Sequence, residues 1–119
     1  MIDVKTKVHY YISPAEKNPF NDFLNSLSPS QQSKILRVFV HLETYGLQQI
    51  IPHIRKLIGT PFWEIRILGK DNIRVVFVAP FKNFILVLHG FVKKTRKTPS
   101  KEIGISYSRY NEWINRKIT

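Results

Sequence analysis

Three apolar segments joined by short connections constrain the fold of this chain more than any other feature. They cover residues 62–68, 73–79 and 84–92, and each is rich in β-branched and aromatic residues, which favour strands. The connections at residues 69–72 and 80–83 are short enough to join antiparallel neighbours and hold residues typical of turns. The segments therefore predict a three-stranded antiparallel meander.

Alternation in the first two of these strands assigns their side chains to faces, because residues two apart in a strand share a face of the sheet. Glu64, Arg66 and Arg74 lie on one face. A single strand arginine is ordinarily a solvated residue, and Arg66 could pair with Glu64. Two of them beside the basic segment 93–99 favour a surface for a polyanion. The predicted core face consists of Trp63, Ile65, Ile67, Ile73, Val75 and Phe77.

The net charge points to the same class of partner. The 119 residues carry a formal charge of +11 at pH 7, and most of the excess lies in residues 61–119. Such a charge favours a nucleic acid, an anionic membrane or an acidic protein as partner. The chain shows no long basic helix with a broad apolar face of the kind that lies in a membrane surface. RNA, DNA and an acidic protein remain.

Length and cysteine content limit the class of protein further. Residues 1–119 suffice for one domain with a core of its own. The absence of cysteine excludes disulfides and thiolate metal sites. The N-terminus shows no apolar signal region, and no segment approaches the roughly 18 apolar residues that a membrane span requires. We therefore expect a single-domain, soluble, cytoplasmic protein.

Two helices are predicted ahead of the meander, after a first strand. Residues 5–12 alternate as a strand that joins the meander, and residues 15–27 have helical spacing with Pro19 near their start. A second helix has Ser28 as N-cap, Pro29 at its first position and Gln31 to complete a capping box. It ends at Gly46. Its predicted buried stripe consists of Ile35, Leu36, Phe39, Val40 and Leu42.

A connecting loop and a last helix complete the predicted fold. Residues 47–61 hold two prolines and a glycine and should form a loop that exposes His53, Arg55 and Lys56. Thr98 as N-cap and Pro99 as first residue open the last helix. The order is βααβββα, an α+β fold with two helices packed on one face of a small antiparallel sheet and the other face open to a ligand. The stripe of the last helix consists of Ile103, Tyr107, Tyr110 and Ile114.

The residues available for catalysis suit RNA cleavage without a metal or other cofactor. The eight carboxylates form no group with histidine at a metal-ligand spacing, and no phosphate loop, nucleophile elbow or Ser/His/Asp arrangement occurs. In metal-free cleavage the 2′-hydroxyl of the RNA attacks the adjacent phosphate. The protein then supplies a base, an acid and positive charge for the developing phosphorane. Arginine suits the last role because its planar fork holds two phosphate oxygens.

The sequence leaves the acid and the base open. His89, a lysine whose pKa is lowered by cationic neighbours, and Tyr107 are the candidates. His89 fits equally well as a core or sheet-edge residue, and Tyr107 fits better as a packing residue. The other histidines have no comparable neighbours and are expected to be structural or exposed.

Several of these motifs resemble a known family. The segments KLIG at 56–59, FWEIR at 62–66, IRVVF at 73–77 and LHGFVKKTRKTP at 88–99, followed by Glu102, are similar to the RelE/ParE toxin superfamily, in particular its HigB-like, phage-derived branch. The match spans nearly the whole chain. The resemblance implies a RelE-like fold and the toxin of a type II toxin–antitoxin system. Such a toxin cleaves mRNA on the ribosome without metal, inhibits translation and is neutralised by a separately encoded antitoxin, usually a helix-turn-helix protein.

Carried over by position, the resemblance implies a set of site residues. The strand cations of the family match Arg66 and Arg74, and its basic segment matches Lys93, Lys94 and Lys97. Glu64 departs from the pattern, since some ribonucleases of the superfamily have a lysine there; it could act as a base or hold Arg66. The candidate catalytic residues are Arg66, Arg74, His89 and Lys94; the candidate RNA-binding residues are Lys56, Lys93, Arg96 and Lys97; Glu64 and Tyr107 are further candidates.

Two other functions remain open on the same fold, because a fold does not fix a function. One is non-catalytic inhibition of DNA gyrase, the activity of the ParE branch. The other is a basic RNA-binding module without activity. Strand arginines together with His89 and the lysine cluster favour the nuclease, because phosphate chemistry needs convergent cations.

Overall fold

The computed structural model describes residues 5–47, 53–67, 69, 72–96 and 98–118, and within them the fold is α+β, as predicted. The described part holds three helices and five strands, with the β1 and β5 strands side by side. In chain order the elements are β1 (Lys7–Tyr10), α1 (Pro19–Asn25), α2 (Pro29–Tyr45), β2 (Ile54–Lys56), β3 (Phe62–Ile67), β4 (Ile73–Phe81), β5 (Phe84–Val92) and α3 (Ser100–Ile118).

The sheet contains the predicted meander but is mixed rather than antiparallel. Its order is β1-β5-β4-β3-β2, and β2 to β5 pair antiparallel with their neighbours. β1 runs parallel to β5, with Lys7 opposite Phe84. The expectation of a fully antiparallel sheet was therefore wrong. Alternation reports which face a side chain takes, but it carries no information on the direction in which an edge strand is added.

The predicted loop at residues 47–61 contains a strand. β2 pairs with β3 and places Arg55 opposite Glu64. Residues 48–52, which include Pro52, lie outside the described residues. A strand of three residues is too short to show a two-residue period, so the predicted order βααβββα lacked it.

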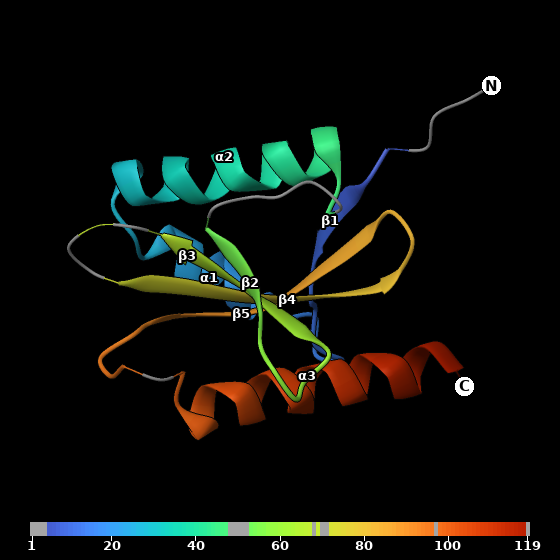
Figure 1. The fold of residues 1–119 in the computed structure, drawn as a ribbon. Coiled ribbons are helices and arrows are strands. Elements are labelled where there is room, and N and C mark those ends of the chain that lie inside the picture. The colour runs from blue at the N-terminus through green and yellow to red at the C-terminus, as the bar shows by residue number, and fades with distance from the viewer. Residues whose placement is uncertain (1–4, 48–52, 68, 70–71, 97, 119) are drawn as a thin grey trace.

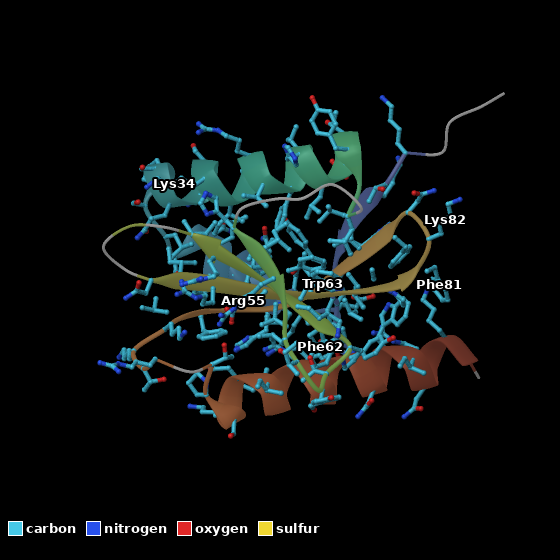
Figure 2. The ribbon with its side chains drawn as sticks, viewed as in Figure 1. Lys34, Arg55, Phe62, Trp63, Phe81 and Lys82 are labelled. Atoms are coloured by element: carbon cyan, nitrogen blue, oxygen red, sulfur yellow. The ribbon has the colours of Figure 1, made fainter. Side chains whose placement is uncertain are left out.

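The helices form layers on both faces of the sheet (Figure 1). α1 and α2 cover one face, where Ile35, Phe39 and Leu42 pack on the predicted core face of β3 and β4. α3 covers the other, where Phe62, Trp113 and Phe91 form a second core. Successive residues Phe62 and Trp63 point to opposite cores (Figure 2). The prediction that the second face is open was wrong, because α3 folds back over it.

The buried stripe of α2 is narrower than predicted. Leu36 and Val40 are 43% and 60% exposed. They were expected to be buried because their spacing is helical, but they line an open groove between α2 and the edge strand β1. The residues Ile35, Phe39 and Leu42 are buried as predicted.

The helix starts follow from their capping residues. At α2, Ser28 Oγ accepts from the Gln31 N–H and the Gln31 side chain accepts from the Ser28 N–H, so the predicted capping box is confirmed. α1 begins only at Pro19, behind an Asn18 cap, rather than at residue 15. α3 begins at Ser100, one residue later than predicted, and the Thr98 hydroxyl donates to Glu64 Oε2 (2.6 Å) instead of capping the helix.

None of the described helices is both long enough and apolar enough to cross a membrane.

Gly90 in β5 allows α1 to approach the sheet closely. A Cβ added there would lie within 3.0 Å of ring atoms of both Phe20 and Phe23. Gly104 in α3 is its natural control, because a Cβ there would meet nothing within 4 Å.

We expect Gly90→Ala to lower the free energy of unfolding by about 1–3 kcal/mol, because the methyl group overpacks the rings of buried Phe20 and half-buried Phe23. Gly104→Ala should instead raise it by about 0.5–1 kcal/mol, because it removes glycine from an exposed helix position. Urea unfolding of both variants measures the two effects. Equal, small effects of the two substitutions would show that α1 does not pack on β5 as described.

Candidate functional site

An open cleft of about 590 Å³ lies where β5 leads into the segment before α3. Its described lining holds five basic residues and no carboxylate. The lining residues are Arg66, Asn72, Arg74, Lys93, Lys94, Thr95 and Arg96. Such a lining attracts an anion.

Two arginines stand directly opposite each other at the base of this cleft. The β3–β4 pairing sets Arg66 against Arg74, as the predicted alternation requires. Like charges in this position repel. Arg74 is only 5% exposed and its Nη1 donates to the Ile73 carbonyl (3.1 Å). The buried Nε atoms of Arg66 and Arg74 have no hydrogen-bond partner within the described residues. The pair is therefore short of acceptors, which an oxyanion would supply.

A fully buried carboxylate lies next to the two arginines. Glu64 is 0% exposed, and its Oε1 lies 3.3 Å from Arg55 Nη2 and 3.6 Å from Arg74 Nε. Its Oε2 accepts from the Thr98 hydroxyl at 2.6 Å. The sequence had suggested that Arg66 could pair with Glu64. Among the described ion pairs, Glu64 instead bridges Arg55 and Arg74. One carboxylate against several cations leaves the cleft positive.

Lys93 is the buried lysine of the cleft. It is 8% exposed, and no hydrogen bond or ion pair of its ammonium group is found within the described part of the chain. Burial lowers the pKa of Lys93, and the positive charges of Arg74, Arg55 and Arg66 lower it further, while Glu64 opposes them. A lysine with a lowered pKa gives up its proton more readily, as proton transfer requires.

His89 is held by α3 and is not among the residues that line the cleft. The β4–β5 register shifts after Val76, which is opposite His89. Its Nδ1 lies 3.2 Å from Arg109 Nη1 and its Nε2 lies 3.3 Å from Glu102 Oε1. Arginine can only donate, so Nδ1 accepts and Nε2 carries the proton that faces Glu102. Burial lowers the pKa of His89, which keeps the ring neutral near pH 7.

Two further candidates from the sequence stand away from the cleft lining. The Lys56 ammonium on β2 donates to the Thr60 carbonyl. Tyr107 on α3 packs edge-on against Phe62, with ring centroids 4.7 Å apart. Tyr107 thus lies in the second core.

The remaining candidates lie in the segment after β5. Lys94 and Arg96 are exposed and line the cleft. Lys97 lies outside the described residues. Lys93, the candidate RNA-binding lysine, is buried, whereas Lys94, the candidate catalytic lysine, is exposed. An exposed lysine suits RNA binding and a buried one suits catalysis, so the two environments are the reverse of those expected.

Sequence reasoning missed Arg55 and Thr98 as neighbours of Glu64. Arg55 reaches Glu64 only through the β2–β3 register, and Thr98 only through the path of the chain into α3. The signal in the sequence is a glutamate on the same strand face as two arginines, which indicates that Glu64 has cationic partners but does not identify Arg55 or Thr98. In the described residues, no group of three His, Cys, Asp or Glu side chains could hold a metal ion.

Comparison with known proteins identifies a family and a similar solved structure. The family described as "Phage derived protein Gp49-like (DUF891)" matches residues 22–111, about three quarters of the chain. A solved structure, the heterotetrameric YoeB–YefM toxin–antitoxin complex from Staphylococcus aureus, contains a chain that is 19% identical, with a TM-score of 0.49 over 71% of this chain and 92% of that one. Among curated proteins no significant match is found.

The buried histidine makes stability depend on pH. Because the folded-state pKa of His89 lies below its unfolded value near 6.5, the unfolded chain binds more protons in this range. Stability is therefore present above about pH 6.5 and is lost as the pH falls. The charged neighbours that face His89 are Glu102 and Arg109, both on α3.

We expect the free energy of unfolding of the wild type to fall more steeply between about pH 7.5 and 5.5 than that of His89→Gln, which does not titrate. Urea unfolding at the two pH values measures this difference. His41→Gln, at a half-buried position on α2, serves as the matched control and should follow the wild type. Identical pH dependence of wild type and His89→Gln would show that His89 is not held neutral by burial.

Proposed function

The chain belongs to the Gp49-like family of phage-derived proteins, a family of RelE-like toxins, and on this premise we propose that it is a toxin–antitoxin toxin that cleaves mRNA. The proposed activity is that of a metal-independent, ribosome-dependent endoribonuclease that stops translation. We place it in the HigB-like branch, as its motifs suggest.

One observation carries the nuclease proposal. Arg66 and Arg74 face each other across β3 and β4 at the base of a cleft, and each has a buried Nε without a hydrogen-bond partner in the described residues. A phosphate placed there would give both Nε–H groups a charged hydrogen-bond acceptor, in addition to the ion pair of Arg74 with Glu64. Positive groups fixed on rigid strands need little reorganisation as charge develops, which is the requirement for transition-state stabilisation.

The proposed reaction uses the nucleophile of the RNA itself. The 2′-oxygen forms a bond to phosphorus while the bond to the 5′-oxygen breaks, so the products are a 2′,3′-cyclic phosphate and a 5′-hydroxyl. Arg66 and Arg74 would neutralise the phosphorane. Since the nucleophile is internal, the reaction does not require a metal-bound water.

Among the candidate acids and bases, Lys93 has the most suitable surroundings. It lines the cleft, is buried, and has a lowered pKa. His89 uses both ring nitrogens on α3, and Glu64 is engaged by two arginines and Thr98. We therefore assign proton transfer to Lys93 and RNA positioning to the exposed Lys94 and Arg96. Glu64 is assigned to holding the cations in place.

The charge of the cleft also supports the proposed partners. Ribosomal RNA and mRNA are polyanions that such a surface attracts. A separately encoded antitoxin, of the helix-turn-helix type expected for this branch, would neutralise the toxin by covering the cleft with an acidic segment.

Mapping of new mRNA 5′ ends after expression of the protein tests the function. Cuts within translated codons, 2′,3′-cyclic or 3′-phosphate ends, and activity of chelator-treated protein are expected. Products with a 3′-hydroxyl end would contradict the mechanism. Intact mRNA accompanied by DNA damage would instead identify a gyrase inhibitor, and intact mRNA and DNA with retained RNA binding would identify a binding module.

We expect Arg66→Ala and Arg74→Ala each to lower the single-turnover cleavage rate at saturating ribosomes by about 100- to 1000-fold, because each removes a donor aimed at developing charge. Lys94→Ala should weaken binding and leave the saturated rate nearly unchanged, because it removes one exposed phosphate contact.

Lys101→Ala, at an exposed position near the start of α3, is the control for loss of one charge. Thermal unfolding of each variant excludes a loss of fold, since truncation of arginine also removes the packing of its stem. The assignment would be contradicted if both arginine variants kept near wild-type rates while Lys94→Ala lost the saturated rate. The catalytic groups would then lie within residues 93–99.

A further inference from the structure

A second basic surface lies at the end of the sheet opposite the cleft, around the β4–β5 turn. Phe81 is 60% exposed at this turn and Lys82 follows it directly (Figure 2). Phe81 is the last residue of β4, and a large apolar side chain so exposed beside a lysine can serve as a binding surface. Neither residue belongs to the cleft lining.

Phe81 is part of a row of aromatic side chains. Its ring centroid lies 5.9 Å from that of Phe84 and 6.1 Å from that of Trp113, which also contact each other at 5.8 Å. The exposed His9 ring is stacked on Phe84, with ring centroids 4.1 Å apart and an interplanar angle of 12°. The row fixes the orientation of Phe81 while more than half of the residue stays open to solvent.

Lysines flank this row. Lys7 is exposed and stands opposite Phe84 in the sheet, on the same face as His9. Lys82 is exposed at the turn, and Lys117 Nζ lies 5.8 Å from the Trp113 ring centroid. These cations and the aromatic row together are called the Phe81 surface below.

The two carboxylates of the neighbouring helices do not neutralise the Phe81 surface, because the lysines Lys7, Lys82 and Lys117 outnumber them and one of the two is paired with an arginine. Glu112 accepts from the Tyr11 hydroxyl (2.7 Å) and pairs with Arg116 (2.9 Å). Glu43 accepts from the backbone N–H of Val8 (3.0 Å) and keeps its negative charge, and it lines a pocket that also includes Phe81 and Lys82. The surface therefore keeps a positive charge.

α3 separates the Phe81 surface from the cleft. Cleft residues 93–96 precede the first turn of α3, whereas Trp113 lies in its last third. At 1.5 Å per residue, Ser100 and Trp113 are about 20 Å apart along the helix. Figure 1 shows the loop before α3 and the β4–β5 turn at opposite ends of the molecule.

We propose that the Phe81 surface is a second RNA-binding site, which stacks an unpaired base on Phe81 and holds the adjoining phosphates with Lys7, Lys82 and Lys117. Single-stranded nucleic acid is bound by this combination of aromatic faces and cations, because every base has a face that can stack. Paired bases do not offer that face. The proposal concerns binding alone and does not depend on nuclease activity.

Fluorescence anisotropy with a labelled single-stranded oligoribonucleotide tests the proposal, with 2′-O-methyl groups on every ribose so that it cannot be cleaved. Phe81→Ala/Lys82→Ala should weaken binding at least about fivefold, the lower end of what loss of one stacked base costs. Phe81→Leu, which keeps an apolar side chain without a ring, should weaken it as well. A blunt duplex of the same sequence should show only the smaller effect of the lost lysine.

Val40→Ala/Arg37→Ala is the matched control, because Val40 is also 60% exposed and Arg37 is exposed, but both lie on α2. This control should bind as the wild type does. The Phe81-dependent loss should also persist in the Arg66→Ala/Arg74→Ala background, since the two sites are separate.

Equal affinity of Phe81→Ala/Lys82→Ala and the control for the single strand would overturn the proposal. An equal loss on single strand and duplex would also overturn it, because the contact would then be charge alone. If the protein cleaves no mRNA but the Phe81 variants still lose RNA affinity, the nuclease proposal is contradicted and the proposal of a second RNA-binding site is supported.

Discussion

The ion pairs of Glu64 are the interaction on which the cleft depends. Arg66 and Arg74 would repel each other across the strand pair, and the buried carboxylate beside them offsets that repulsion. Burial of charge has a desolvation cost that such pairs rarely exceed, so Glu64 is better understood as ordering the site than as stabilising the fold. Through Arg55 and Thr98 the same carboxylate ties β2 and the approach to α3 to the centre of the sheet. Loss of Glu64 would leave the buried Arg74 without its carboxylate partner.

The two faces of the sheet have different roles, one in the core and the other partly in the cleft. The face under α1 and α2 is apolar and makes one core. The other face is apolar under most of α3 and becomes cationic where β3 and β4 carry their arginines, so the cleft forms at the boundary between core and solvent. His89 holds α3 at this boundary through Glu102 and Arg109. His89 therefore fixes α3 next to the cleft but does not line the cleft.

The alternation of side chains in the strands predicted one part of the site correctly, namely which residues share a face of the sheet. Because side chains alternate, Glu64, Arg66 and Arg74 had to share a face, and they do. Register, strand direction and chain path carry no local signal, so the contacts of Glu64 with Arg55 and Thr98 and the parallel pairing of β1 were not predictable. Burial of Lys93 next to exposed Lys94 depends on how the chain leaves β5, which composition cannot reveal.

The central claim is that Arg66 and Arg74 together bind a phosphate, and side-chain NMR of the arginine Nε–H groups tests it most directly. The protein is labelled with ¹⁵N and titrated with a ribonucleoside 2′,3′-cyclic phosphate, which matches the proposed product. The account predicts that the Nε–H signals of Arg66 and Arg74 shift together and saturably, while that of Arg37 on the outer side of α2 stays in place. Unchanged signals of Arg66 and Arg74 at saturation, or equal shifts of all three arginines, would contradict it.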